Sequence, residues 1–149
     1  MHFYPPKHHK QASVIIDQVL ARSPSNISSL MSRAFVQQAA LKWKDAGATF
    51  DLVFSIIPDD MNLGLRAREE SAWCRVQNDL FEEGLVDLQL VLDALNRLGD
   101  DVDKRNLNRA RCLWRIGRCH MLLTSQSIYM LLLPPYLLSV DLDMDSAYE

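Results

Sequence analysis

Two pairs of adjacent glutamates, Glu69-Glu70 and Glu82-Glu83, are the residues of this chain that come nearest to general acid and base chemistry. Such catalysis requires two titratable groups that reach the same reacting atom. Both pairs lie in segments of helical periodicity, where adjacent side chains point about 100° apart, so we do not expect either pair to converge. The sequence also contains no glycine-rich phosphate loop, nucleophile elbow or metal-binding motif. We therefore expect no enzymatic activity, no cofactor and no small-molecule substrate.

Three cysteines, Cys74, Cys112 and Cys119, raise the question of a metal site together with His120. A tetrahedral site needs four ligands that surround the ion. Cys112 and Cys119 are seven residues apart on one expected helix and cannot close such a site, and the other histidines lie near residue 9. We expect no metal, and we interpret the cysteines as buried core residues of a protein in a reducing compartment.

A run of basic residues between 104 and 118 has the spacing of a positive helix face, which suits contact with RNA phosphates. However, the run lacks the adjacent aromatic platform on which single-strand binders stack bases. The net charge of −3 and the pI of about 5.8 provide no overall attraction for nucleic acid. We favour a solvated face or a protein contact over direct RNA binding. The run consists of Lys104, Arg105, Arg109, Arg111, Arg115 and Arg118.

The elements that position these residues follow a spacing of 34 residues, the period of the tetratricopeptide repeat. Its pattern is a small residue where two helices cross, a large apolar residue one turn later and a proline after the helix. Stretches of strand-like alternation are missing, so we predict an all-α solenoid of helical hairpins in a right-handed superhelix. Ala12, Ile16 and Pro24 are matched 34 residues later by Ala46, Phe50 and Pro58.

The repeat pattern divides the chain into units and predicts a solenoid truncated at both ends. Residues 1–26 form the second half of a unit with a helix over 10–22, after a loop that contains His8-His9. Residues 27–60 form a full unit with helices over about 26–41 and 46–57, and residues 61–102 form another with helices over 65–78 and 84–98. Residues 103–123 provide only the first helix of a further unit. We interpret the chain as a fragment or as the product of a gene model whose start lies upstream.

The segment 124–149 departs from the repeat pattern and is expected to be a poorly ordered apolar tail, such as a splice or frameshift product would provide. A membrane segment is one alternative, but two prolines and three polar residues interrupt 122–140 and basic flanks are missing. The N-terminal segment lacks the apolar stretch of a signal peptide. We expect a cytoplasmic protein, possibly also nuclear, and we do not favour membrane binding.

The inner stripe of the first helices is the predicted protein-binding groove. In stacked hairpins this stripe is open, and aromatic, methionine and arginine side chains on it suit a peptide with apolar anchors and some acidic residues. The alternative is that these side chains are covered by neighbouring repeats or pack within the chain. Recognition of a peptide carboxyl terminus by a lysine and asparagine clamp is not favoured. The predicted groove residues are Met31, Phe35, Arg66, Trp73, Arg111, Trp114 and Arg118.

Four segments of residues 7–121 resemble a particular tetratricopeptide family: 30–40, 67–74, 80–84 and 112–119. They are similar to fungal sequences of the tetratricopeptide scaffold subunit of the superkiller complex. The resemblance implies a non-catalytic scaffold that holds an RNA helicase subunit and a WD-repeat subunit, and that supports cytoplasmic mRNA decay from the 3′ end with the exosome. Two alternatives remain open, namely a tetratricopeptide adaptor of another complex and a protein tethered to membranes by the apolar tail.

The sequence departs from the family pattern at five polar helix positions that are usually apolar or aromatic. At these positions we expect either looser packing or side chains whose charged ends reach outward to solvent. The five are Arg33, Gln37, Arg68, Ser71 and Arg75.

Overall fold

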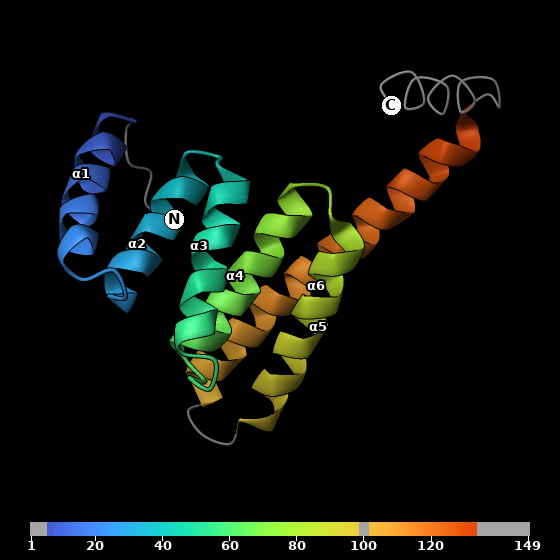
Figure 1. The fold of residues 1–149 in the computed structure, drawn as a ribbon. Coiled ribbons are helices and arrows are strands. Elements are labelled where there is room, and N and C mark those ends of the chain that lie inside the picture. Colours follow the sequence, from blue (N-terminus) through green and yellow to red (C-terminus); the bar gives the residue numbers. More distant parts are fainter. Residues whose placement is uncertain (1–5, 99–101, 134–149) are drawn as a thin grey trace.

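The structure, a computed structural model, describes residues 6–98 and 102–133 (Figure 1). These residues form six helices and no strand, which confirms the all-α prediction for the part of the chain described. The helices are α1 (Pro6–Arg22), α2 (Ile27–Ala39), α3 (Trp43–Ile56), α4 (Leu63–Gln77), α5 (Phe81–Arg97) and α6 (Val102–Leu132).

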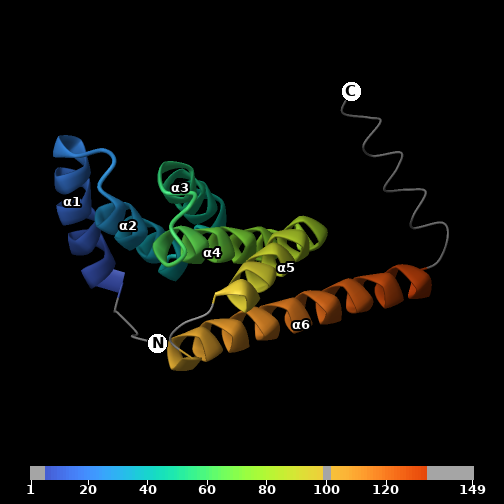
Figure 2. The same cartoon turned by 90° about the horizontal axis from the view of Figure 1, so that it is seen from below.

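Each helix packs against the next one along the chain, and α4 also contacts α6. Helix α1 therefore lies at one end of the array and α6 at the other, as Figures 1 and 2 show from two directions. Pairs α2–α3 and α4–α5 are joined by short turns and form two consecutive hairpins. This order brings α2, α4 and α6 into positions from which they can line one surface.

Two left-handed residues, Leu41 and Asp79, make the turns of these hairpins, with φ angles of 60° and 65°. The reversal takes so few residues that the second helix of each hairpin begins at once, at Trp43 and at Phe81. The sequence-based starts at residues 46 and 84 were therefore three residues too late. The two turns are 38 residues apart, the same separation as the helix-crossing residues Ala46 and Gly84.

Helix α1 begins at Pro6, so His8 and His9 are helical and the prediction of a loop at these residues was wrong. A proline is tolerated in the first turn of a helix because its missing N–H has no intrahelical partner there.

Helices α2 and α4 are capped by side chains before their first turns. Asn26 Oδ1 accepts a hydrogen bond from the Ser29 N–H at 2.9 Å. Before α4, Asp60 Oδ1 accepts from the N–H groups of Asn62 and Leu63 at 2.9 and 2.6 Å. The backbone N–H groups of Asn62, Gly64 and Leu63 lower the pKa of the Asp60 carboxyl. The connection near 59–64, which the repeat spacing marks as an insertion, is thus a structured helix entry.

The core consists of two clusters. One joins α1 to α4 around Leu30, Phe50 and Val53, and the other joins α4 to α6 around Leu88 and Val91. Trp43 packs against the first cluster, in agreement with its expected place across the hairpin. The small residues that mark the repeats are completely buried in the first two hairpins: Ala34, Ala46 and Ala72 are 0% exposed, and Gly84 is buried.

Helix α6 has 31 residues and does not end where the repeat pattern ends. It continues through residue 123 to Leu132, so the first nine residues of the expected irregular tail are helical. Residues 134–149, the remainder of that expected tail, lie outside the described residues. A helix normally ends before the residue that precedes a proline, which matches the end of α6 two residues before Pro134.

Candidate protein-binding groove

A cavity of about 210 Å³ lies between the inner surfaces of α2, α4, α5 and α6. Met31 and Phe35 of α2 form its apolar wall, together with Leu65 of α4 and Val91 of α5. Phe35 is held by an edge contact with buried Phe50, at 5.2 Å between ring centroids. We call this cavity and its lining the groove.

Two of the predicted cations, Arg66 and Arg111, also line the groove. The Arg66 guanidinium lies 5.6 Å from the centroid of the Phe35 ring, and its Nε donates to Glu70 Oε1 at 2.9 Å. Arg111 donates from Nε and Nη2 to the two carboxylate oxygens of Glu69, at 2.9 and 2.6 Å. Each groove arginine is thus oriented by its own buried carboxylate.

Glu69 and Glu70 are 2% and 1% exposed, and both bind the guanidinium of Arg115 from α6. Arg115 Nη1 lies 3.2 Å from Glu69 Oε1 and 3.1 Å from Glu70 Oε1. The expectation that these adjacent carboxylates do not converge was therefore wrong. Their chain directions differ, but one long arginine side chain between them reaches both.

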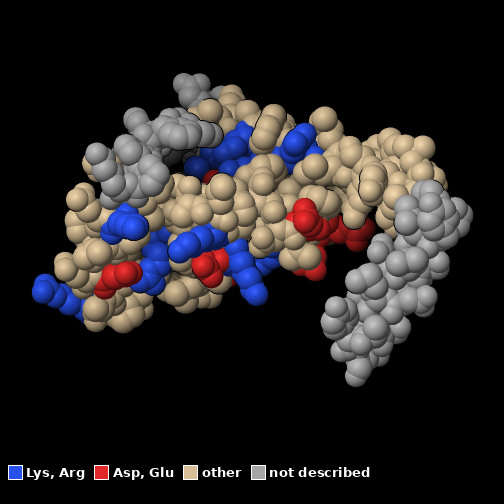
Figure 3. All heavy atoms as spheres, turned by 90° about the horizontal axis from the view of Figure 1, so that it is seen from above, with Lys and Arg blue, Asp and Glu red and all other residues tan. Residues whose placement is uncertain are grey.

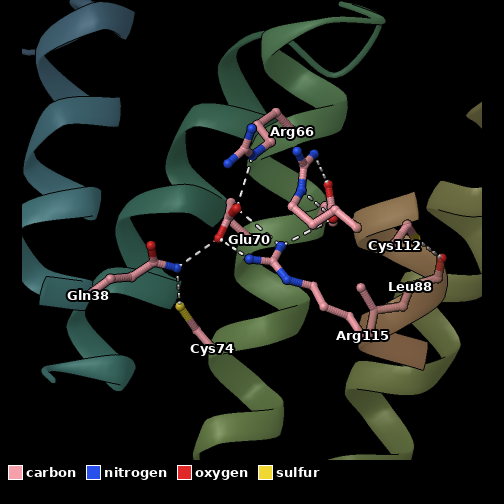
Figure 4. A network of polar contacts seen from close by, with 9 residues as sticks. Gln38, Arg66, Glu70, Cys74, Leu88, Cys112 and Arg115 are labelled. Carbon is pink, nitrogen blue, oxygen red and sulfur yellow. Dashed lines mark hydrogen bonds and ion pairs between the residues drawn. The ribbon is translucent and has the colours of Figure 1, made fainter. Parts of the chain in front are cut away.

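The network extends from α6 to α2. Gln38 Nε2 donates to Glu70 Oε2 at 2.9 Å and contacts Cys74 Sγ at 3.5 Å. Figure 4 shows Gln38, Arg66 and Arg115 converging on Glu70. This buried network, which joins α2, α4 and α6, consists of Gln38, Arg66, Glu69, Glu70, Arg111 and Arg115. Three cations face two carboxylates, so the network has a formal charge of +1.

The chemistry of these groups is that of a fixed ion network. Burial raises the pKa of Glu70, but Arg115, Gln38 and Arg66 outweigh burial and hold the pKa of this carboxyl below its ordinary value. A carboxylate that stays ionised between arginines is a poor proton donor or acceptor near neutral pH.

The pKa of Glu70 predicts a specific dependence of stability on pH. Because the folded state holds this pKa below the unfolded value of about 4.5, Glu70 stabilises the fold fully above pH 4.5 and loses that contribution as the pH falls through the folded pKa. We expect the free energy of unfolding of the wild type to decrease below about pH 4.5, and that of Glu70→Gln to decrease less steeply. Urea unfolding at stepwise lower pH, with exposed Glu83→Gln as control, measures this. Equal slopes for the wild type and Glu70→Gln would contradict it.

The cysteines are buried thiols. Burial raises the pKa of Cys74 to about 11 and that of Cys112 to about 12, so neither is a thiolate at neutral pH. The Cys112 thiol donates to the Leu88 carbonyl oxygen at 3.3 Å. Within the described ranges 6–98 and 102–133, no group of three or more His, Cys, Asp or Glu residues is placed to hold a metal ion.

The other three predicted groove residues, Trp73, Trp114 and Arg118, do not line the cavity. Trp73 and Trp114 contact each other with ring centroids 5.7 Å apart, and the Arg115 guanidinium lies 5.2 Å from the Trp73 ring. Trp114 is 63% exposed, and Arg118 is exposed on α6. The seven predicted residues are therefore divided between the groove and the surface of α6.

The unusually polar positions form a second set of contacts, outside the groove, between α3, α4 and α5. Ser71 donates to Asp51, and Arg75 binds Asp51 at 3.1 Å and Asp87 at 3.0 Å. Arg68 lies 3.6 Å from Asp87. These residues replace apolar packing with interhelical ion pairs rather than leaving it loose. Figure 3 shows basic side chains gathered in a hollow of one face, and basic and acidic side chains side by side along the band below it.

Sequence reasoning missed the roles of Glu69, Glu70 and Arg115. One available signal was the spacing of Arg111 and Arg115, which places two cations on one side of α6 one turn apart. Pairing them with glutamates more than 40 positions earlier depends on the packing of α6 against α4, which local spacing does not specify.

In comparisons with known proteins, no family model, no curated protein and no solved structure matches the chain. Among the described residues, no helix combines the length and the apolar character that crossing a membrane would need.

Proposed function

We propose that this chain is a non-catalytic tetratricopeptide scaffold that binds protein partners in the groove. The observation that carries the proposal is the cavity of about 210 Å³ where α2, α4, α5 and α6 meet, with an apolar wall and oriented arginines. Concave surfaces of this kind are the usual binding surfaces of stacked helical hairpins. The 34-residue spacing of Ala12 and Ala46 and the buried helix crossing at Gly84 support the assignment to this repeat class.

The groove suits a peptide that places an apolar side chain against Phe35 and Leu65 and a carboxylate beside Arg66. Arg66 uses its Nε for Glu70, and its guanidinium is about one-third exposed, with a side-chain exposure of 35%. Its terminal amino groups can therefore bind an acidic side chain of the partner. Direct RNA binding is less well supported, because two arginines of the basic run, Arg111 and Arg115, are already paired with buried carboxylates.

The favoured biological context is the superkiller complex, in which the chain would hold the RNA helicase and WD-repeat subunits during cytoplasmic mRNA decay with the exosome. This part of the proposal rests on the resemblance over residues 7–121. An adaptor role in another complex is the alternative, and the partners recovered with the chain distinguish the two.

The test is affinity purification of the tagged full chain from fungal extract after RNase treatment, with the two expected subunits quantified. We expect both subunits with the wild type, and an at least tenfold lower recovery with the double variant Phe35→Ala, Arg66→Ala. Leu90→Ala on α5, an exposed apolar residue outside the groove, is the matched control.

Circular dichroism of each variant separates lost binding from lost folding. A folded wild type that recovers neither subunit would show that the superkiller context is wrong. Equal recovery by the wild type and the double variant would show that the groove is not the binding surface.

A further inference from the structure

Helix α6 is packed on only one side. Cys112, Arg115 and Cys119 are buried against α4 and α5, and Figures 1 and 2 show α6 at one edge of the molecule with its C-terminal part projecting beyond the other helices. At 1.5 Å per residue, its 31 residues span about 46 Å.

The outward side of α6 has an apolar repeat of seven residues. Leu107, Trp114, Met121 and Ile128 are each seven positions apart and are between 52% and 69% exposed. Three positions after each lies a second series, Ala110, Gly117, Thr124 and Leu131. Two apolar or small residues per heptad form the seam by which helices pair as coiled coils. We call these eight residues the α6 seam.

The seam alternates large and small side chains along the helix. At Gly117 the contrast is greatest, because a Cβ atom built there would meet nothing within 4 Å. A notch of this depth beside Trp114 and Met121 suits a facing helix that places a large side chain at the same level.

The seam is complementary to itself when two copies run antiparallel. In the register where Met121 of one copy faces Gly117 of the other, every remaining seam position also finds a seam partner. Trp114 then faces Thr124, Ile128 faces Ala110, and Leu107 faces Leu131. Three of the four kinds of layer thus combine a large side chain with a small one, as close interhelical packing requires.

We propose that the α6 seam is the interface of an antiparallel homodimer. The five large seam residues include Leu131, which is 85% exposed. At about 100 Å² for each large side chain, two copies bury on the order of 1,000 Å², the lower range of specific interfaces. Since α4 and α5 occupy the opposite side of α6, pairing leaves the groove contacts within each copy in place.

The first test is the mass of the full chain in solution, measured by sedimentation velocity over a range of concentrations. We expect the wild type to shift from the monomer mass of 17.1 kDa towards twice that value. Met121→Glu places a charge at the centre of the seam and should weaken the association at least tenfold. Leu90→Glu, on α5 and outside the seam, is the matched control and should dimerise like the wild type.

The second test fixes the register by disulfide formation between copies. An oxidised mixture of Gly117→Cys and Met121→Cys chains should form a crosslinked heterodimer, and Gly117→Cys alone should crosslink much less. Dominant crosslinking of Gly117→Cys with itself would contradict the antiparallel register. A wild type that stays at the monomer mass at all concentrations would overturn the proposal and leave the seam to a helix of a different protein.

Discussion

Replacing Arg115 by methionine is expected to lower the free energy of unfolding by about 3 to 5 kcal/mol. The substitution keeps the apolar stem over Trp73 but removes the only guanidinium bound to both Glu69 and Glu70 among the described residues. Each carboxylate is at most 2% exposed, so water cannot replace the lost partner. Because domains of this size are stable by about 5 to 15 kcal/mol, the loss is a large fraction of the total.

Urea unfolding at neutral pH, followed by circular dichroism, measures this loss at a concentration where all variants are monomeric. The matched control is Arg118→Met on the exposed side of the same helix, for which we expect a change within about 0.5 kcal/mol. Adding Glu69→Gln and Glu70→Gln to Arg115→Met should cost less than the sum of the separate effects, because the uncompensated charges disappear. Equal effects of Arg115→Met and Arg118→Met would mean that the buried network does not stabilise the fold.

Replacing Gly84 by alanine is expected to destabilise the protein by about 2 kcal/mol. A Cβ atom at this position would lie 2.5 Å from Val76 Cγ2 and 2.8 Å from the Ala72 carbonyl oxygen. The second contact involves the backbone of α4, so relief requires α5 to move away from α4 rather than one side chain to rotate.

The matched control is Gly117→Ala, where the added methyl group meets open space. There the higher helix propensity of alanine should raise the free energy of unfolding by about 0.5 to 1 kcal/mol. The two identical chemical changes are thus expected to have opposite signs in the same urea experiment. A stabilising effect of Gly84→Ala would show that α4 and α5 do not approach as closely as the structure places them.

Gly84 also illustrates what the sequence could predict. A repeat of hairpins requires small residues at its helix crossings, and the spacing of Ala46 and Gly84 located the two crossings correctly. The helix starts were less predictable, because a left-handed Leu41 has no compositional signal and two-residue reversals look like the longer polar turns that prolines and glycines mark.

The C-terminal end of α6 was missed for a similar reason. Ser125, Gln126 and Ser127 interrupt the apolar pattern and suggested a change of structure, but the Ser127 hydroxyl donates to the Leu123 carbonyl oxygen and the helix continues. Within the groove, Met31, Phe35, Arg66 and Arg111 were located by helical register alone. The partners of the two arginines were not, because contacts between distant helices depend on how the helices stack.

The buried ion network also restricts how sequences of this kind can diverge. An apolar core position tolerates a series of single replacements of similar size, whereas losing Glu69, Glu70 or Arg115 alone leaves a buried charge without its partner. The glutamate pair of α4 and the Arg111 and Arg115 spacing of α6 should therefore be inherited, or replaced, as a block. In distant descendants of the same ancestor, two adjacent acids followed some forty residues later by Arg-x-x-x-Arg should remain recognisable after the apolar repeat positions have drifted.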